Sequence, residues 1–212
     1  MSPKILTNGP SGARWQLILA HGSGAPMDSD FMNTVAEGLA AEGLRVLRFE
    51  FPYMRKRRLT GKPSPPDRAP VLEASWREMV DRHPHPRQLI GGKSLGGRVA
   101  ARVAPSLPVR AVICLGFPFH APATPERTRL DDLSALTVPT LILQGTRDPF
   151  GTKSEVRAYR LPRHIQTHWL ADANHSFEPP RSSGHTHAEH LSSAVQAITA
   201  FVRKLESADA QP

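Results

Sequence analysis

Residues 92–96 have the spacing of a serine nucleophile. They read GKSLG, the pattern G-x-S-x-G, and follow a short apolar run. A nucleophile on a tight turn between a strand and a helix exposes its hydroxyl, and glycines two positions away avoid a steric collision. A glycine-rich packing turn is the structural alternative. A phosphate-binding loop is excluded, because that motif needs glycine where this chain has Arg87. The pattern predicts Ser94 as a nucleophile.

A serine hydroxyl needs a base, and the base needs an acid that orients it. His175 follows one apolar run and Asp148 follows another, so both come directly after predicted strands. Asp148 also fits a simple turn before proline, and His175 fits a surface loop. Asp172 is an alternative acid, although it lies close in sequence to His175. We predict Ser94, Asp148 and His175 as a catalytic triad.

The glycine-rich segment 21–26 is a candidate oxyanion hole. It follows the apolar run 16–20 and reads HGSGAP. Two preorganised N–H donors stabilise the negative oxygen of a tetrahedral intermediate. The backbone N–H groups of Ser23 and Leu95 are the predicted donors, and an ordinary glycine turn is the alternative. His21 is predicted to be structural, because the chain order already supplies a base.

These residues depend on a series of strands and helices to bring them together. Short apolar runs without strict alternation predict strands covered on both faces, at 16–20, 44–51, 88–92, 111–115, 140–144 and 167–170. Apolar residues at helical spacing predict helices at 30–43, 71–82, 95–103, 155–161 and 191–205. The alternation predicts an α/β fold with a doubly wound, mostly parallel sheet and helices on both faces. Ligands bind such sheets beyond the carboxyl ends of the strands, where the candidate residues lie.

Ser94, Asp148 and His175, with His21 and Gly22 upstream, resemble the α/β-hydrolase superfamily. The resemblance covers nearly the whole chain, from Trp15 to Leu205. It is strongest to the small lidless branch that includes dienelactone-hydrolase-like proteins. Dienelactone hydrolases use cysteine as the nucleophile, whereas serine stands at that position here.

The resemblance implies a trimmed version of the fold. Members often insert a lid after the strand that corresponds to 111–115, but here only the 23 residues 116–138 precede the next strand. Members often begin with two more strands, of which residues 1–14 supply one at most. We expect one domain over residues 1–205 with six or seven strands and no cap domain. Residues 206–212 are expected to form a flexible tail.

Loops near the nucleophile would shape an open site. Gly24, Phe117 and Phe119 are predicted to contact substrate, together with the loop 51–53. The aromatic residues have an alternative role as a cap on the core. Since no spacing rule decides the volume of such a pocket, the sequence predicts a small acyl substrate without naming it.

The chain of 212 residues carries 27 Lys and Arg against 19 Asp and Glu, a net charge of +8. A basic balance is typical of nucleic-acid partners, but most of the arginines are scattered. The one dense cluster, Arg55–Arg58, has few aromatic residues interleaved with it and is predicted to be a solvated loop. An anion-binding patch is the alternative. Nucleic acid is therefore not the expected partner.

No apolar run approaches the roughly 20 residues of a membrane-spanning helix, and no secretory signal is visible. The expected compartment is the cytoplasm, without a membrane partner. The single cysteine, Cys114, lies in an apolar run and is predicted to be a buried hydrophobe. His185, His187 and His190 are predicted to begin a solvent-facing helix rather than to bind a metal.

The predicted function is hydrolysis of an ester, thioester or related acyl bond of a small substrate through an acyl-enzyme. The prediction needs no metal and no organic cofactor. A non-catalytic scaffold that keeps the fold is the alternative from another class, because fold does not establish function. The oligomeric state is left open.

Overall fold

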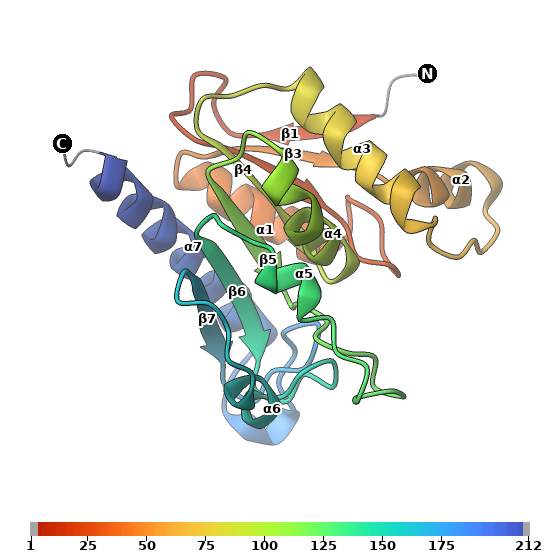
Figure 1. Ribbon diagram of the computed structural model, residues 1–212, viewed down its shortest axis with the longest axis vertical. Helices are drawn as coiled ribbons and strands as arrows, with labels where there is room; N and C mark the ends of the chain where they lie inside the picture. The colour runs from red at the N-terminus through yellow and green to blue at the C-terminus, as the bar shows by residue number, and fades with distance from the viewer. Residues whose placement is uncertain (1–3, 210–212) are drawn as a thin grey trace.

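The computed structural model describes residues 4–209 and contains one seven-stranded sheet (Figure 1). The strand order is β1-β3-β2-β4-β5-β6-β7, and only the pair β1–β3 is antiparallel among these neighbours. The strands are β1 (Ile5–Asn8), β2 (Gln16–Ala20), β3 (Arg45–Phe49), β4 (Gln88–Lys93), β5 (Ala111–Leu115), β6 (Thr140–Gly145) and β7 (Ile165–Leu170). The chain runs outward from β2 to β3 and then back through β4 to β7, which confirms the doubly wound, mostly parallel sheet.

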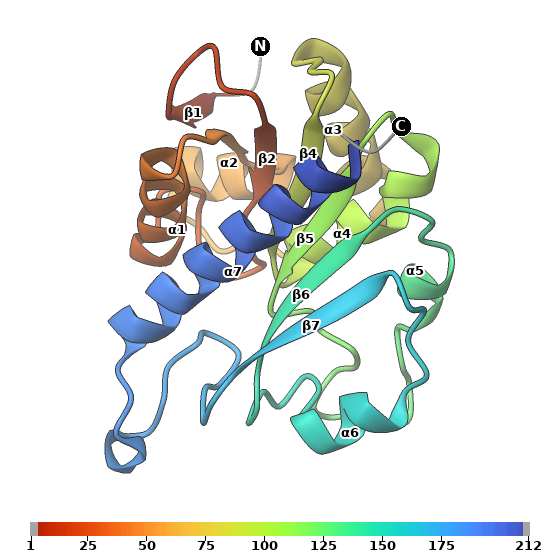
Figure 2. The ribbon, with the colours of Figure 1, turned by 90° about the vertical axis from the view of Figure 1, so that its left-hand side faces the viewer.

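Helices cover both faces of the sheet (Figure 2). They are α1 (Asp30–Ala41), α2 (Pro52–Thr60), α3 (Ala69–Arg82), α4 (Leu95–Val103), α5 (Asp131–Ser134), α6 (Lys153–Ala158) and α7 (His187–Asp209). α1 and α7 pack side by side on one face, whereas α3 and α4 pack against each other on the opposite face. Two separate clusters of buried apolar side chains result, one under each helical layer.

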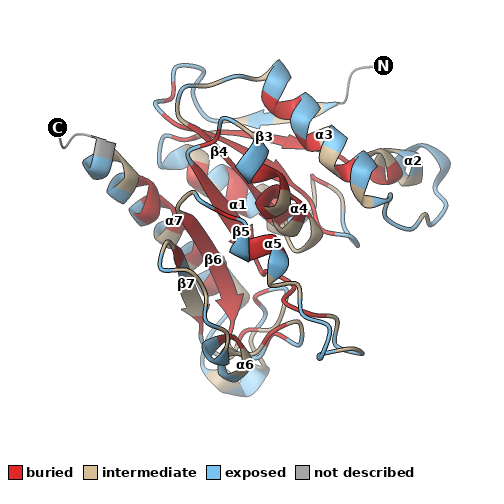
Figure 3. Cartoon of the chain, viewed as in Figure 1, coloured by how far each residue is buried: buried red, intermediate tan, exposed pale blue. Residues whose placement is uncertain are grey.

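The central strands are buried on both sides, as Figure 3 shows, whereas the edge strands β1 and β7 are only partly buried. Every residue of β2, β5 and β6 is buried. Two apolar faces explain why these runs lack the alternation of a half-exposed strand. The carboxyl ends of the strands meet at one edge of the sheet, and this edge carries the loops that follow each strand.

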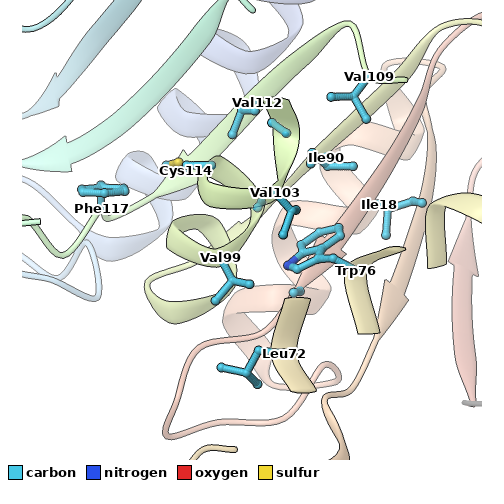
Figure 4. Packing of buried hydrophobic residues seen from close by; sticks show 14 of the residues in the cluster. Ile18, Leu72, Trp76, Ile90, Val99, Val103, Val109, Val112, Cys114 and Phe117 are labelled. Carbon is cyan, nitrogen blue, oxygen red and sulfur yellow. The ribbon is translucent and has the colours of Figure 1, made fainter. Parts of the chain in front are cut away.

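The larger apolar cluster joins α3 and α4 to the sheet (Figure 4). Trp76 of α3 is fully buried, and its ring meets Phe49 edge to face with centroids 5.0 Å apart. Ile18 and Ile90 come from neighbouring strands beneath it. Burying side chains of this size stabilises the fold by roughly 1.5–3 kcal/mol each. This packing holds the helix that follows Ser94 firmly against the sheet.

The structure corrects two expectations about helices. Residues 52–60 form the helix α2 and not a solvated loop, with proline in the first turn and Gly61 in a left-handed conformation after the last turn. The chain end was expected to be flexible from residue 206, but α7 continues through Asp209. Glu206 accepts a hydrogen bond from Trp15 Nε1 at 2.8 Å, which anchors this end of the helix. Residues 210–212 lie outside the described residues.

The connection between β5 and β6 contains no cap domain, as expected. Its one α-helix, α5, is four residues long. Asp132 of α5 accepts hydrogen bonds from Arg98 at 2.6 Å and from Arg102 at 2.8 Å, and both arginines lie on α4. The connection is thus folded down against the helical layer, and the carboxyl edge of the sheet stays open. None of the helices within residues 4–209 is long and apolar enough to cross a membrane.

Candidate active site

Ser94 lies in the turn between β4 and α4, in a backbone conformation that side chains rarely adopt. Its φ is 49° and its ψ is −110°. Such conformations cost about 1–3 kcal/mol and persist only where the surrounding structure holds them. Here the Ser94 N–H donates to the carbonyl of Leu115 at 3.0 Å, and the Ser94 carbonyl accepts from the N–H of Arg98 at 3.0 Å. The sharp turn lifts the hydroxyl above the sheet edge.

The glycines of the motif are required by close backbone approach. A Cβ on Gly92 would overlap the carbonyl oxygen of Ala20, and a Cβ on Gly96 would lie 2.7 Å from the carbonyl oxygen of His21. Both oxygens belong to the end of the neighbouring strand β2 and the loop after it. The G-x-S-x-G spacing is therefore explained by the packing of the turn against this loop.

The side chains of Ser94, His175 and Asp148 form a hydrogen-bonded series across three loops. Ser94 Oγ donates to His175 Nε2 at 2.8 Å, and His175 Nδ1 donates to Asp148 Oδ2 at 2.7 Å. A carboxylate only accepts, so it fixes the imidazole proton on Nδ1 and leaves Nε2 free to accept from the serine. The structure thus brings together the three residues predicted as a triad, whereas no hydrogen bond or ion pair joins the alternative acid Asp172 to His175.

Asp148 is fully buried and saturated with donors. Its Oδ1 accepts from the backbone N–H of Phe150 at 2.8 Å, and its Oδ2 also accepts from Gln144 Nε2 at 2.9 Å. The ring of Phe150 covers His175, with centroids 4.3 Å apart. A buried carboxylate needs hydrogen-bond donors in place of water, and this one accepts from Phe150, Gln144 and His175.

The electrostatics of the site favour a neutral imidazole. Burial lowers the pKa of His175 below its ordinary value of 6.5, the hydrogen bond to Asp148 opposes this, and the charge of Lys93 lowers the pKa further. A neutral imidazole is the form that accepts a proton from serine. The site is therefore ready to act as a base near neutral pH.

Hydrogen bonds with the segment 51–53 hold the segment 21–24 in place. The Phe51 N–H donates to His21 Nε2 at 3.1 Å, so the proton of this imidazole lies on Nδ1, which donates to the Gly22 carbonyl at 2.6 Å. Tyr53 Oη donates to the carbonyls of Gly22 at 3.2 Å and Ser23 at 3.3 Å. His21 is buried and neutral, with its pKa lowered by burial. Its role is structural, as the sequence predicted.

The two predicted oxyanion donors belong to two segments next to the serine. Leu95 is the first residue of α4, where backbone N–H groups lack partners within the helix and the helix dipole favours negative charge. Ser23 belongs to the segment 21–24 and lines the same cavity as Ser94. Their role as donors to an oxyanion remains a prediction.

A cavity of about 510 Å³ opens beside Ser94. Ser23, Gly24, Phe31, Lys93, Ser94 and His175 are among the residues that line it. A hollow of similar volume, about 560 Å³, lies at the opposite edge of the sheet beside Arg14 and His85. No serine, threonine or cysteine lines that hollow, so chemistry and not volume identifies the candidate site.

The structure corrects the predicted substrate contacts of Phe117 and Phe119. Both side chains are fully buried and belong to the larger apolar cluster, with ring centroids 5.0 Å apart. Neither lines the cavity at Ser94, because Phe119 packs inward against Tyr159 at 5.7 Å. They take the alternative role as part of the core. Gly24 does line the cavity.

The basic cluster Arg55–Arg58 is only partly available to a partner. Arg58 binds two carboxylates, those of Glu50 and of Asp28, the latter at 2.7 Å. Arg57 donates to the Ser23 carbonyl at 3.1 Å. Two of the four cations thus anchor α2 to the loop 21–28 and do not form a free anion-binding patch.

The histidine cluster does not behave as a unit. His190 is buried, contrary to the prediction of a solvent-facing start, and its Nδ1 lies 2.9 Å from the Phe177 carbonyl. His187 lines the cavity, and its Nε2 donates to the Ser176 carbonyl at 3.1 Å. Within residues 4–209, no three His, Cys, Asp or Glu side chains are grouped closely enough to hold a metal ion.

Two site residues were missed by the sequence reasoning. Lys93 lines the cavity and donates from Nζ to the His175 backbone carbonyl at 2.6 Å. Its signal was its place inside the nucleophile motif. Gln144, buried at the end of β6, binds Asp148 and accepts from the backbone N–H of Phe117 at 2.8 Å. A polar residue in an otherwise apolar strand was the available signal. Cys114 is buried, as predicted, and burial raises the pKa of its thiol to about 12.

Residues 13–203 match the model of a protein family described as an alpha/beta hydrolase domain. The fold is similar to that of a lidless α/β serine hydrolase from Xanthomonas campestris, with a TM-score of 0.70 and 20% identity, covering 94% of this chain and 88% of that one. A dienelactone hydrolase from Anabaena variabilis gives a TM-score of 0.72 and 23% identity, covering 95% and 91%. An α/β serine hydrolase homologue from Coxiella burnetii gives 0.67 and 19%, covering 93% and 90%. At these identities the likeness shows a shared fold.

Proposed function

Because this chain belongs to the alpha/beta hydrolase domain family, we propose that it is a serine hydrolase. The proposed substrate is an ester, thioester or related acyl compound that is small enough for the open cavity. The observation that carries the proposal is the continuous series of hydrogen bonds from Ser94 through His175 to the buried Asp148. A purely structural serine has no need of a neutral imidazole aimed at its hydroxyl.

The first half of the reaction forms an acyl-enzyme. Ser94 Oγ attacks the carbonyl carbon while its proton passes to His175 Nε2. Asp148 keeps the other imidazole proton on Nδ1 and stabilises the imidazolium. The negative oxygen of the intermediate is placed toward the N–H groups of Ser23 and Leu95. Collapse of the intermediate expels the alcohol or thiol, which takes the proton from His175.

The second half releases the acid. Water enters from the open cavity, and His175 takes one of its protons as the water oxygen attacks the acyl carbon. The second intermediate collapses, the bond to Ser94 Oγ breaks, and the serine recovers its proton from His175. All proton transfers use residues of this chain and water.

The test is labelling of the purified protein with a fluorophosphonate probe, which reacts with activated serines. We expect one modified residue, Ser94, identified by mass spectrometry, and no label on the Ser94→Ala variant. The free energy of unfolding of this variant is expected to lie within about 0.5 kcal/mol of that of the parent, since the change removes one partly exposed oxygen. A panel of p-nitrophenyl esters of rising chain length then measures turnover. A folded protein that neither labels nor hydrolyses any ester would overturn the proposal and favour a non-catalytic scaffold.

A further inference from the structure

Lys93 places a cation in the wall of the cavity, directly before the serine in sequence. The side chain is partly exposed, and its Nζ donates to the backbone carbonyl of His175 at 2.6 Å. The ammonium also lies over the faces of Phe31 and Phe177, 5.6 and 5.8 Å from the ring centroids. These contacts hold the cation beside the reacting groups.

These contacts leave N–H donors of the ammonium without hydrogen-bond acceptors. It has three N–H donors, and within residues 4–209 a single hydrogen-bond acceptor, the His175 carbonyl, lies within reach of Nζ. No carboxylate of the described chain lies within 4.0 Å of it. A partly buried cation without a carboxylate in direct contact is unfavourable, and burial lowers the pKa of Lys93 to about 8, although the charge of Asp148 opposes this shift.

Two arginines of this protein, by contrast, have carboxylate partners. Arg58 pairs with Glu50, and Arg98 pairs with Asp132. Asp30 and Glu178 also line the cavity, but both are exposed and neither forms an ion pair with Lys93 Nζ. Lys93 thus differs from these ion pairs in lining the cavity without a carboxylate partner.

We propose that Lys93 binds a carboxylate carried by the substrate, which makes it a specificity-determining residue of the site. The proposal rests on the proposed hydrolase function and deepens it: the preferred substrates are acyl esters or thioesters that also bear an anionic carboxylate. The two remaining donors of the ammonium complete their hydrogen bonding with this group. Charge-assisted hydrogen bonds of this kind are stronger than neutral ones.

A bound carboxylate also changes the electrostatics of the base. The positive charge of Lys93 disfavours the imidazolium form of His175, and this form develops when the serine proton is transferred. A substrate anion on Lys93 offsets that repulsion during the reaction. The benefit therefore appears in kcat as well as in KM.

The experiment compares esters that differ in one group. Monophenyl adipate is paired with phenyl adipamate, which has a carboxamide in place of the carboxylate. A second pair, 4-acetoxybenzoate and 4-acetoxybenzamide, carries the group on the leaving alcohol. We expect kcat/KM to favour the carboxylate of at least one pair by roughly tenfold to hundredfold, after correction for alkaline hydrolysis rates. The pair that shows the preference identifies the side of the scissile bond that faces Lys93.

Two variants separate recognition from structure. Lys93→Met keeps the length of the side chain without the charge, and we expect the preference for the carboxylate to fall to about one. Lys93→Arg keeps the charge and is expected to retain much of the preference. A residue that merely anchors the His175 loop would lower both members of a pair equally. A ratio that is unchanged in Lys93→Met overturns the proposal.

A binding measurement separates this proposal from the proposed function. The Ser94→Ala protein cannot turn over, so calorimetry with monophenyl adipate and phenyl adipamate reports recognition alone. Tighter binding of the carboxylate, lost in Ser94→Ala/Lys93→Met, supports the Lys93 site even if no ester is hydrolysed. Equal binding of the two compounds together with efficient hydrolysis rejects the Lys93 site and leaves the hydrolase intact. If Lys93→Met does not fold, Lys93→Gln, which keeps one donor to the His175 carbonyl, takes its place in both assays.

Discussion

Gln144 Nε2 donates to Asp148 Oδ2 at 2.9 Å, four residues along the chain from strand to loop. The same amide accepts from the Phe117 N–H at 2.8 Å and donates to the carbonyls of Phe117 and Gly151, each at 3.2 Å. This one buried side chain joins the loop that carries the acid to the loop after β5. The position of Asp148 therefore depends on a residue that does not contact the substrate cavity.

Gln144→Leu should damage both stability and catalysis. The Phe117 N–H and one lone pair of Asp148 lose their partners in a buried place, which should cost about 1–3 kcal/mol in the free energy of unfolding. A misplaced acid should lower kcat/KM by roughly tenfold or more. Urea unfolding and ester kinetics measure the two effects. Gln166→Leu, on the exposed face of β7, is the control and should stay within about 0.5 kcal/mol. Equal behaviour of the two variants would contradict the assigned role.

Asp148→Asn tests the orientation of the base. Only one of the two amide atoms can accept a hydrogen bond, and an NH2 group that faces Nδ1 favours the imidazole tautomer with the proton on Nε2. That tautomer cannot accept the serine proton, so kcat should fall by about 10⁴ with the fold retained. Circular dichroism and kcat are the measurements. Full activity would show that another acid orients His175, and Asp172 would be the first to test.

Much of this architecture was predictable because the signals are local. Strands covered on both faces appear as continuous apolar runs, and the residues after them lie at one edge of a parallel sheet. Chain order was therefore enough to bring Ser94, Asp148 and His175 together. The helix α2 was missed because four consecutive basic residues, Arg55–Arg58, hide its apolar positions. Its boundary signals, a proline at the start and Gly61 at the end, were nevertheless present in the sequence.

Side-chain direction was the part that the sequence could not supply. Phe117 and Phe119 follow a strand, as catalytic loops do, yet they point into the core, where Phe119 meets Tyr159 from a distant segment. The partners of Lys93 are similarly remote, since His175 is 82 positions away. Burial and cavity lining depend on such long-range packing. A single sequence contains no local pattern for them.

The fall of kcat/KM at low pH should report the protonation of His175. Since burial lowers its pKa below 6.5, the free enzyme keeps a neutral base down to that range, and kcat/KM for a neutral ester should fall only below pH 6.5. Lys93→Met removes a like charge that disfavours the imidazolium. The pKa of His175 should then rise, and the midpoint of this fall should move to higher pH. The measurement is kcat/KM against pH for phenyl acetate in buffers of constant ionic strength. A midpoint that moves to lower pH in Lys93→Met would contradict the electrostatic account.

Gly92→Ala should be severe for steric reasons alone. The new methyl group would overlap the Ala20 carbonyl and lie 2.9 Å from the backbone carbon of Gly96. Neither is a flexible side chain that could move aside, so we expect a loss of at least about 2 kcal/mol in stability, or no folded protein. Gly12→Ala is the matched control, because no heavy atom lies within 4 Å of its added Cβ. Thermal melts compare the two, and similar melting temperatures would count against a tightly packed turn.

Tyr53→Phe addresses the loop that carries the proposed oxyanion donor Ser23. The hydroxyl donates to the carbonyls of Gly22 and Ser23 at 3.2 and 3.3 Å, and burial raises the pKa of Tyr53, so it stays protonated and able to donate. Removing one oxygen should cost only about 0.5–1.5 kcal/mol in stability. If the Ser23 N–H stabilises the oxyanion, the loosened loop should lower kcat more than it raises KM, by roughly tenfold. Tyr159→Phe is the control, because this ring is partly buried and packs against Phe119 of the larger apolar cluster. A kcat for Tyr53→Phe that equals that of Tyr159→Phe would show that the loop is not held in place by this hydroxyl, or that another group binds the oxyanion.

Replacing Ser23 with proline, which has no N–H, separates the two explanations. If the Ser23 N–H binds the oxyanion, the replacement removes its contribution and kcat falls.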